Sequence, residues 1–593
     1  MNGLLSFFPI YVNGLLAIFF VFVLPGSVLV HAVNIPSFPQ RWLVVFLSSL
    51  TANHLLVTLI AQLHLNPLGT FRAVTAALIL VLTILIARKA RTTAVAGGSI
   101  MRGSDAIWLT GSLVVLCFTY LNVWKHGVPN IFQGGDVSVS WNPWAMIWSQ
   151  GSFPTSSYGY PQFVPTIWAV SYIFTGSPEH YFAYYIYVVF ILVPIILSTA
   201  VLARVDWRYA AALLVVFVWF VTEIREPWLR STLQEGFPDW IAAISGFCGT
   251  VLFIVNAPDG RFDREKIVTA FASLCLVSIA ATTKPLNGVF TIAILIAVCT
   301  DAAKHLGPAQ RNKLTISALG LVAAFAAAYA VYYSHLSVRS MPNYPVPALS
   351  DRLSRAWNLL NSNFTIPFRI LLFAGLAVSP FLPRIRWLAL PLVAAFSMWA
   401  NTASYDLRNL LGVLLITAFI PIYALARRFA TAAVASSARQ WCISDSTVVL
   451  GLAALCVALT SPLALSDEKL NQRFTDEQLS KGLGIELNRP IGQLLARGCK
   501  IFSADGYIYT VVAFQPYRQQ MEFFHFSEPL TDLLTKQLNE STGCTGIMYP
   551  PSRTHQSILA LIDALSISHG YTKIVEYRGM DLLVSNRNAP TKN

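Results

Sequence analysis

The sequence predicts an all-α polytopic membrane protein of about fourteen spans, followed by a small C-terminal α/β domain. Hydrophobic residues make up 55% of the 593 residues and charged residues only 12%. The mean hydropathy is +0.58, and the apolar density falls only after about residue 466. This composition excludes a water-soluble protein for most of the chain.

Apolar runs of about 17–25 residues define the predicted spans, because a helix of that length crosses about 30 Å of hydrocarbon. They begin near residues 10, 42, 70, 106, 181, 209, 238, 267, 285, 314, 368, 387, 408 and 447. The N-terminal stretch lacks a basic segment and a cleavage site, so we expect it to start the first span and not to be a removable signal. The break at Lys284-Pro285 leaves a re-entrant pair as an alternative for residues 271–300.

Lysine and arginine predict the orientation. If the spans alternate in direction, the basic loops fall on one side, which the positive-inside rule makes cytoplasmic. These loops hold Arg88, Lys89, Arg91, Arg102, Arg204, Arg208, Arg261, Arg264, Lys266, Lys304, Arg311, Lys313, Arg384, Arg386, Arg427, Arg428 and Arg439. Topology thus accounts for the net charge of +13. No basic stretch interleaves with exposed aromatic residues, so we expect no nucleic-acid partner.

The chain divides into three parts. Residues 1–105 are predicted to be additional N-terminal spans, 106–466 a transmembrane core with a first outer loop at 126–180, and 467–593 a soluble extracytoplasmic domain. In that domain we expect strands from Cys499 and from Cys544, a helix over 557–569, and a strand pair turning at 578–579. An oxidising compartment would favour a disulfide between the two cysteines, and two unpaired core thiols are the alternative.

The outer loop contains one acidic residue among aromatic, proline and glycine residues from 135 to 176. This residue, Asp136, precedes a stretch in which apolar side chains recur at helical spacing, which is typical of an amphipathic helix in the headgroup zone. The recurring residues are Trp141, Trp144, Ala145, Ile147 and Trp148. We place the chemistry at Asp136, and a helix N-cap or a solvated carboxylate is its alternative role.

Few charged residues lie at the outer ends of the other apolar runs, where charge is costly. They are Glu223, Arg225, Glu226, Arg230, Glu235, Asp239, Lys284, Asp406 and Arg408. Each also has a structural alternative: Glu223 with Arg225, or Asp406 with Arg408, would simply pair, and Lys284 would cap a helix end. Together they place several cations able to hold a phosphate on the face that carries one loop carboxylate.

Four segments, taken in order, resemble a known family. They are YPQFVPTIWAVSYIFTG, EGFPDWIAAISGF, ATTKPLNGVF and YDLRNLLGVLLITAFIPIYAL. With an acid near the start of a long first outer loop, they are similar to the GT-C superfamily of integral-membrane glycosyltransferases. That superfamily includes protein O-mannosyltransferases, lipid A aminoarabinose transferases and bacterial lipopolysaccharide glycosyltransferases. The resemblance covers roughly residues 106–430.

The resemblance implies roles for individual residues. Asp136 matches the catalytic base, Asp239 a supporting acid, and Lys284 and Arg408 the donor-phosphate ligands. Arg225 and Arg230 are further phosphate candidates, and the loop residues Trp141, Trp144, Tyr160 and Gln162 are candidates for acceptor contacts. The chain departs from the pattern at Gly135-Asp136-Val137, where many relatives have Asp-Glu, at Asn409, where relatives often have Tyr, and in about three additional N-terminal spans. An acidic metal pair is therefore not evident, and a divalent metal stays open as a cofactor.

The resemblance implies a function in the cell envelope. It predicts a bacterial inner-membrane enzyme that transfers a sugar, with inversion, from a polyprenyl-phosphate donor to an acceptor hydroxyl on the outer face. The acceptor would be lipopolysaccharide, a lipid-linked glycan or a protein. Two alternatives stay open: an O-antigen ligase or polymerase that uses the loop from His335 to Pro367, and a transporter or flippase of lipid-linked sugars, against which the one-sided grouping of charges argues.

Overall fold

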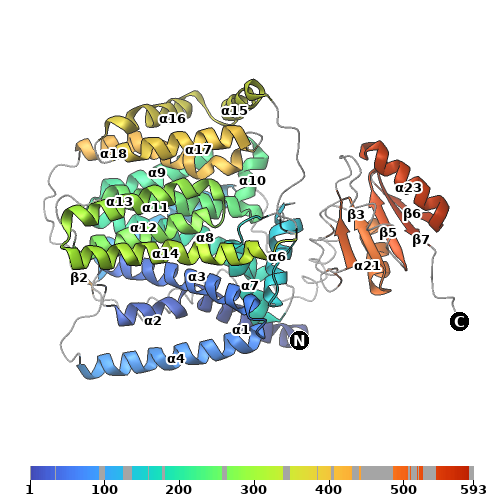
Figure 1. Cartoon of the computed structure of the whole chain (residues 1–593), viewed down its shortest axis with the longest axis horizontal. Coiled ribbons are helices and arrows are strands. Elements are labelled where there is room, and N and C mark those ends of the chain that lie inside the picture. The colour runs from blue at the N-terminus through green and yellow to red at the C-terminus, as the bar shows by residue number, and fades with distance from the viewer. Residues whose placement is uncertain are drawn as a thin grey trace.

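Figure 1 shows a bundle of long helices and a separate small sheet domain. The computed structural model describes residues 2–33, 35, 37–92, 101–123, 132, 136–155, 157, 159–176, 180–256, 263–337, 348–382, 385–402, 406–429, 440–441, 485–504, 508, 514, 517, 520–524, 543–577 and 579–585. In both views the sheet domain lies beyond the end of the bundle that carries α6 and α10. We call this end the α6 end.

Four helices lie before residue 105, and their assignment as a separate N-terminal part stays a prediction. They are α1 (Asn2–Phe22), α2 (Leu24–Ala32), α3 (Phe38–Gln62) and α4 (Pro67–Thr92). Helix α3 packs against α2, α7 and α8. In contrast, only 6% of the most apolar segment of α4 is buried inside the protein. Such an apolar, outward-facing helix is stable only against lipid.

The transmembrane core is built around α11 (Pro238–Asn256), whose apolar window is 100% buried. A helix that is apolar on all sides is stable only when other helices surround it. Its main neighbours are α8, α12 and α18. The long helices of the core besides α11 are α5 (Gly103–Val123), α8 (Tyr181–Val205), α9 (Trp207–Glu223), α12 (Arg264–Ala281), α13 (Gly288–His305), α14 (Pro308–Ser334) and α18 (Leu411–Phe429).

Shorter elements connect the long helices. They are η1 (Val137–Trp141), α6 (Asn142–Ser149), α7 (Phe163–Thr175), α10 (Pro227–Glu235), η2 (Pro285–Asn287), α15 (Leu349–Asn363), α16 (Ile366–Val378), η3 (Ser379–Phe381), η4 (Arg386–Leu388), α17 (Ala389–Thr402) and η5 (Leu407–Leu410). At the end opposite α6, β1 (Met101–Arg102) pairs with β2 (Gln440–Trp441).

The span count needs correction. Within the described residues, nine helices are long and apolar enough to cross a membrane, or up to ten if the bent pair α16 and α17 counts as one span. The runs near 368 and 387 form this bent pair. The runs near 209 and 267 form α9 and α12, which are too short or too charged at one end to count as spans. The run near 447 lies outside the described residues. The helical membrane fold is confirmed, and the count of fourteen is not.

The bundle separates the predicted cytoplasmic arginines from Asp136. Helix α8 starts at the α6 end, because His180 at its N-cap contacts Asn142 of α6, and it ends in the turn that holds Arg204. Arg204 forms a buried ion pair of 2.6 Å with Asp105 at the start of α5. Arg204 and the described part of the outer loop therefore lie at opposite ends of the bundle, and which end faces the cytoplasm stays a prediction.

The C-terminal domain has a five-stranded sheet of order β4-β3-β5-β7-β6 in its described part. The elements are α21 (Ile485–Ala496), β3 (Lys500–Ser503), β4 (Met521–Phe523), β5 (Thr545–Tyr549), η9 (Pro551–Arg553), α23 (Gln556–His569), β6 (Tyr571–Tyr577) and β7 (Met580–Ser585). Strand β3 is parallel to β4 and β5, and β7 is antiparallel to β5 and β6.

The expected strands, helix and final hairpin of this domain are all present, whereas β4 and α21 were not predicted. Cys499 and Cys544 form a disulfide, joining the residues just before β3 and β5. A link between neighbouring strands restricts the unfolded chain over a separation of 45 residues. The predicted domain boundary at 466 lies outside the described residues.

Candidate active site

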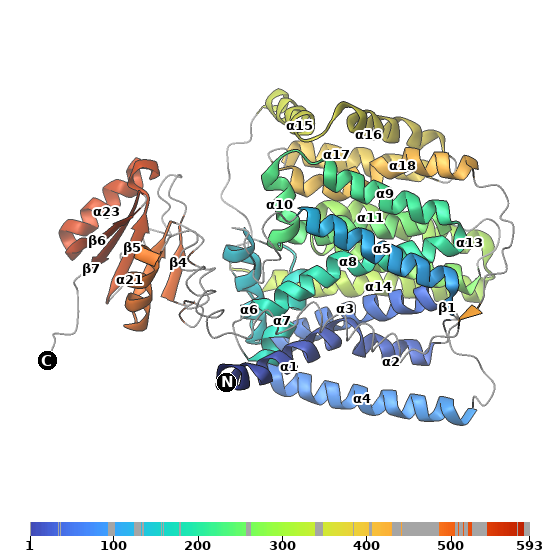
Figure 2. The same cartoon turned by 180° about the vertical axis from the view of Figure 1, so that it is seen from behind.

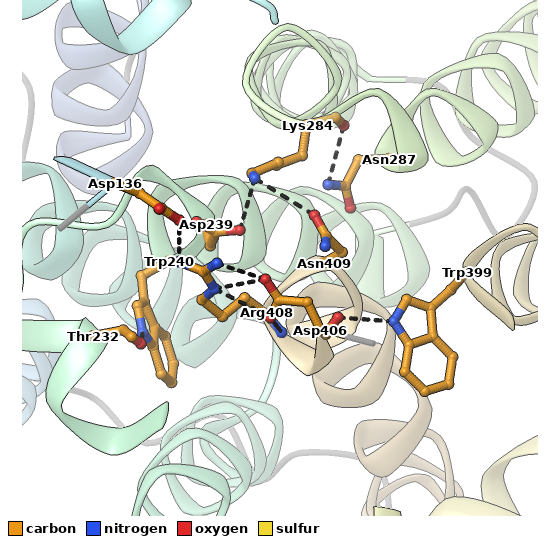
Figure 3. A network of polar contacts seen from close by, with 10 residues as sticks. All are labelled: Asp136, Thr232, Asp239, Trp240, Lys284, Asn287, Trp399, Asp406, Arg408 and Asn409. Atoms are coloured by element: carbon orange, nitrogen blue, oxygen red, sulfur yellow. Dashed lines mark hydrogen bonds and ion pairs between the residues drawn. The ribbon is translucent and has the colours of Figure 1, made fainter. Parts of the chain in front are cut away.

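Helix N-termini from distant parts of the sequence meet at the α6 end (Figure 3). Asp136 is the residue before η1, Asp239 lies in the first turn of α11, Lys284 precedes η2, and Arg408 lies in η5 at the start of α18. The N-terminus of a helix carries a partial positive charge and unpaired N–H groups. An arrangement of several such ends with two cations favours an anionic ligand.

Arg408 is the centre of the first half of the site. Its Nε and Nη2 contact Asp406 Oδ2 at 2.8 and 2.6 Å, and its Nη1 contacts Asp136 Oδ2 at 2.8 Å. Asp406 also caps η5, because it accepts a hydrogen bond from the backbone N–H of Arg408. The guanidinium lies 4.7 Å from the ring centroid of Phe237. The paired carboxylate and the ring therefore fix the planar fork of Arg408 in one orientation.

Lys284 is the centre of the second half. Its Nζ lies 2.9 Å from Asp239 Oδ1, and the two side chains are only 14% and 2% exposed. Burial alone would lower the pKa of Lys284, but the charge of Asp239 more than offsets this, so the pKa lies above the usual lysine value. Lys284 is therefore a buried cation.

The two halves form one polar network (Figure 3). Lys284 Nζ donates to Asn409 Oδ1 at 3.5 Å, and Asn409 directly follows Arg408. The backbone carbonyl of Lys284 accepts a hydrogen bond from Asn287. The structure thus brings Asp136, Asp239, Lys284 and Arg408 together, although the sequence separates the first and the last by 272 positions.

The predicted interfacial helix exists as α6, but its tryptophans pack on protein. Trp141, Trp144 and Trp148 are 4%, 8% and 1% exposed, because α6 lies against α7. The Trp141 and Tyr160 rings lie 5.5 and 5.7 Å from Lys284 Nζ. These aromatic residues therefore pack around the lysine. On the described part of this loop, the tryptophans form no outward-facing apolar stripe.

Gln162 holds two of the aromatic residues of this loop in place. Its carbonyl oxygen accepts from Trp148 Nε1 at 3.1 Å, and its amide donates to the Tyr160 carbonyl at 2.7 Å. Gln162 is only 3% exposed. Both polar ends of Gln162 therefore have partners within the protein, and its contact with an acceptor stays a prediction.

Arg225 and Arg230 do not join the network. The Arg230 guanidinium donates to the carbonyls of Ile224 and Thr222 at the end of α9, and Arg225 is exposed. Glu223 does not pair with Arg225 but accepts from the Thr365 backbone N–H at the start of α16 at 3.0 Å. Glu223 thus connects α9 to α16, and Arg230 connects α10 to the end of α9.

Sequence reasoning gave Phe237 and Asn409 no role in the site and gave Asp406 only a structural pairing with Arg408, and these three residues complete the network. Glu235 also lies within the electrostatic range of Arg408; burial raises the pKa of its carboxyl group, and Ser231 and Arg408 partly offset this. Gly236, at φ +95°, ends α10 and allows close packing of Phe132 that a side chain would block. The sequence feature that could have placed Asp406 in the site is its position two residues before Arg408, which allows it to cap η5 and pair with that arginine.

Helix capping, a structural alternative, is not seen for Asp136, whereas pairing with Asp406, the alternative for Arg408, is seen. Asp136 occupies the N-cap position of η1, but its side chain makes no capping hydrogen bond. Asp406 and Arg408 do pair, as the alternative stated, while Arg408 also reaches Asp136. Among the described residues, no group of three or more His, Cys, Asp or Glu side chains is arranged to hold a metal ion.

No family model matches the sequence, and no curated protein matches it significantly. Among solved structures, the chain is similar to the "Crystal Structure of ArnT from Cupriavidus metallidurans in the apo state". The identity is 12% and the TM-score 0.46, over 80% of this chain and 98% of that chain. At these values the likeness concerns the overall fold alone and says nothing of individual residues.

Proposed function

We propose that this protein is a membrane glycosyltransferase that moves a sugar from a polyprenyl-phosphate donor to an acceptor hydroxyl at the outer face of the membrane. The observation that supports this most directly is the contact of the solvent-accessible carboxylate of Asp136 with Arg408, beside a second buried cation, Lys284. A base next to two phosphate ligands is what glycosyl transfer from a lipid phosphate requires.

Arg408 and Lys284 would bind the donor phosphate. As the bond from the anomeric carbon to the phosphate oxygen breaks, the electron pair and negative charge move onto the phosphate. Fixed cations in a partly buried site stabilise this charge without reorganising, which water at the same place would have to do. The converging N-termini of η2, η5 and α11 would add to the same effect.

Asp136 would accept the proton of the acceptor hydroxyl while the acceptor oxygen attacks the anomeric carbon. General-base assistance typically contributes about 10²–10⁴-fold. Attack from the side opposite the phosphate inverts the anomeric configuration. Asp239 and Asp406 are held by Lys284 and Arg408, so they would orient the cations and leave the proton transfer to Asp136.

The C-terminal domain would guide the acceptor. It lies beyond the α6 end in Figure 1, and the localisation in a bacterial inner membrane with this end outside is part of the proposal. The lipopolysaccharide, lipid-linked glycan or protein that supplies the hydroxyl would then approach from outside the cytoplasm.

The test is transfer from a polyprenyl-phosphate sugar in membranes that contain the protein. Radiolabelled sugar should move from the donor into a lipid-, glycan- or protein-bound product, and a membrane with an Asp136→Asn variant should show none above background. Transport of an intact lipid-linked sugar without cleavage of the phosphate bond would instead favour the flippase alternative. The ligase alternative receives no support from the described part of the 335–367 loop, where the ring of His335 stacks on Phe153 and Arg352 donates to the carbonyl of Asn401.

A further inference from the structure

The Asp136 side chain is held by one contact, whereas its partner is held by several. The Asp136 side chain is 58% exposed, and among the described residues its polar contact is the one with Arg408 Nη1. Arg408 is 13% exposed and stays anchored through Asp406 and Phe237 whether or not Asp136 is bound. The pair is therefore asymmetric: Asp136 can leave, and Arg408 stays in place.

Two carboxylates contact the guanidinium of Arg408 in the described part of the chain. Its Nε and Nη2 face Asp406, and its Nη1 faces Asp136. Of these carboxylates, Asp136 is the more exposed, so a phosphate oxygen that approaches Arg408 from solvent meets the Nη1 position that Asp136 now occupies. Two anions cannot share that position, because they repel each other and compete for the same N–H groups.

The same contact limits Asp136 as a base. An oxygen that accepts a hydrogen bond from a guanidinium is already used by a donor, and a general base must lie within hydrogen-bond reach of the proton it takes. An ion pair with one largely exposed partner is weak, so a phosphate with a second ligand in Lys284 would displace Asp136 readily.

We propose that Asp136 and the donor phosphate compete for Nη1 of Arg408, so that donor binding releases the base. This rests on the proposed function. In the resting protein Arg408 holds Asp136 away from the acceptor. When the phosphate takes over Arg408, Asp136 is free, accepts the proton of the acceptor hydroxyl as the glycosidic bond forms and the bond to the phosphate breaks, and passes that proton to water. The base is thereby available only when a donor is present, and the donor binds first.

The test is the affinity for a short-chain isoprenyl phosphate, farnesyl phosphate, measured by titration of the purified protein in detergent. If Asp136 competes with the phosphate, Asp136→Asn should bind about two- to fivefold more tightly than the wild type, although it is impaired in transfer. Asp351→Asn, on the exposed face of α15, removes one carboxylate charge away from the site and should bind as the wild type does. Arg408→Lys should bind more weakly.

The outcomes separate the competition from the function it rests on. If the wild type binds and Asp136→Asn binds equally or more weakly, Asp136 does not compete with the phosphate and the inference is wrong, while the proposed donor class stands. If Asp351→Asn tightens binding as much as Asp136→Asn, the effect is one of net charge alone and the inference is again wrong. If the wild type and every variant fail to bind while remaining folded by thermal unfolding, the donor class itself is wrong, and the competition falls with it.

Discussion

Arg408 Nη1 and Asp136 Oδ2 lie 2.8 Å apart, and they join the start of α18 to the start of the first outer loop. Each residue is placed by its own helix N-terminus, and the contact forms only because η1 and α18 begin on the same side of the bundle. The candidate catalytic base and a candidate phosphate ligand thereby become neighbours.

Asp136→Asn should reduce sugar transfer by about 10²–10⁴-fold, because the amide cannot accept a proton. The amount of folded protein should not change, since the side chain is 58% exposed and makes one polar contact. Initial rates in membranes with a polyprenyl-phosphate sugar, at matched protein levels, measure the effect, with Asp351→Asn as control. Near-normal turnover would show that another residue is the base.

Arg408→Lys should lower transfer by at least about tenfold, because an ammonium group cannot keep the paired contacts with Asp406 and also bind phosphate. Arg225→Lys is the matched control, since Arg225 is exposed and outside the network. Both variants are assayed at several donor concentrations. If the two lose equal activity, the phosphate site extends to the loop after α9 and the assignment to Arg408 alone is wrong.

Lys284→Met should destabilise the protein, because it leaves the buried carboxylate of Asp239 without its cation. Removing one partner of a buried pair costs about 3–5 kcal/mol, whereas replacing both partners by apolar residues is often neutral. The double variant Lys284→Met/Asp239→Leu should therefore melt closer to the wild type than the single variant does, yet stay inactive. Thermal unfolding in detergent measures this, and a double variant that is less stable than the single one contradicts it.

Acidification should destabilise the contact between α6 and α8 through His180. Asn142 Nδ2 donates to His180 Nε2 at 3.0 Å, an arrangement that needs a neutral ring, and burial lowers the pKa of His180 from 6.5 to about 4. The unfolded chain therefore binds the proton first, and stability falls as the pH drops from about 6.5 to about 4, by up to about 3 kcal/mol.

Melting temperatures at pH 7 and pH 5 test this prediction. The difference should shrink in His180→Gln, because glutamine can accept from Asn142 and does not titrate. His305→Gln, at an exposed end of α13, should keep the wild-type difference. An unchanged pH dependence in His180→Gln would assign the acid sensitivity to other groups.

A tag on Asn593 should be labelled by a membrane-impermeant reagent in intact spheroplasts, because the charge pattern places the C-terminal domain outside the cytoplasm. Removing residues from about 470 onward should then weaken use of the natural acceptor more than donor binding. A tag that is protected until the membrane is broken would invert the orientation and remove the rationale for a polyprenyl-phosphate donor on the outer face.

Hydropathy and charge by themselves predicted a helical membrane protein and the start of most long helices, and they selected Asp136, Lys284 and Arg408 as candidate site residues. These signals are local: a run of apolar residues must cross lipid wherever it packs, and a lone acid or cation at its end is costly in any fold. The strands after Cys499 and Cys544 were also predicted from a local signal, the short apolar and β-rich run that follows each cysteine.

Only the tertiary structure decided which charges meet. Arg225 and Arg230 have the same chemistry as Arg408, but they are placed elsewhere because α9 ends against α16. The tryptophans of α6 turn inward because α7 offers them a surface, and Asp406 became a member of the site because it caps η5 beside Arg408. Partner choice depends on how helix ends are arranged in space, and residues brought together from positions as distant as 136 and 408 leave no local pattern in the sequence.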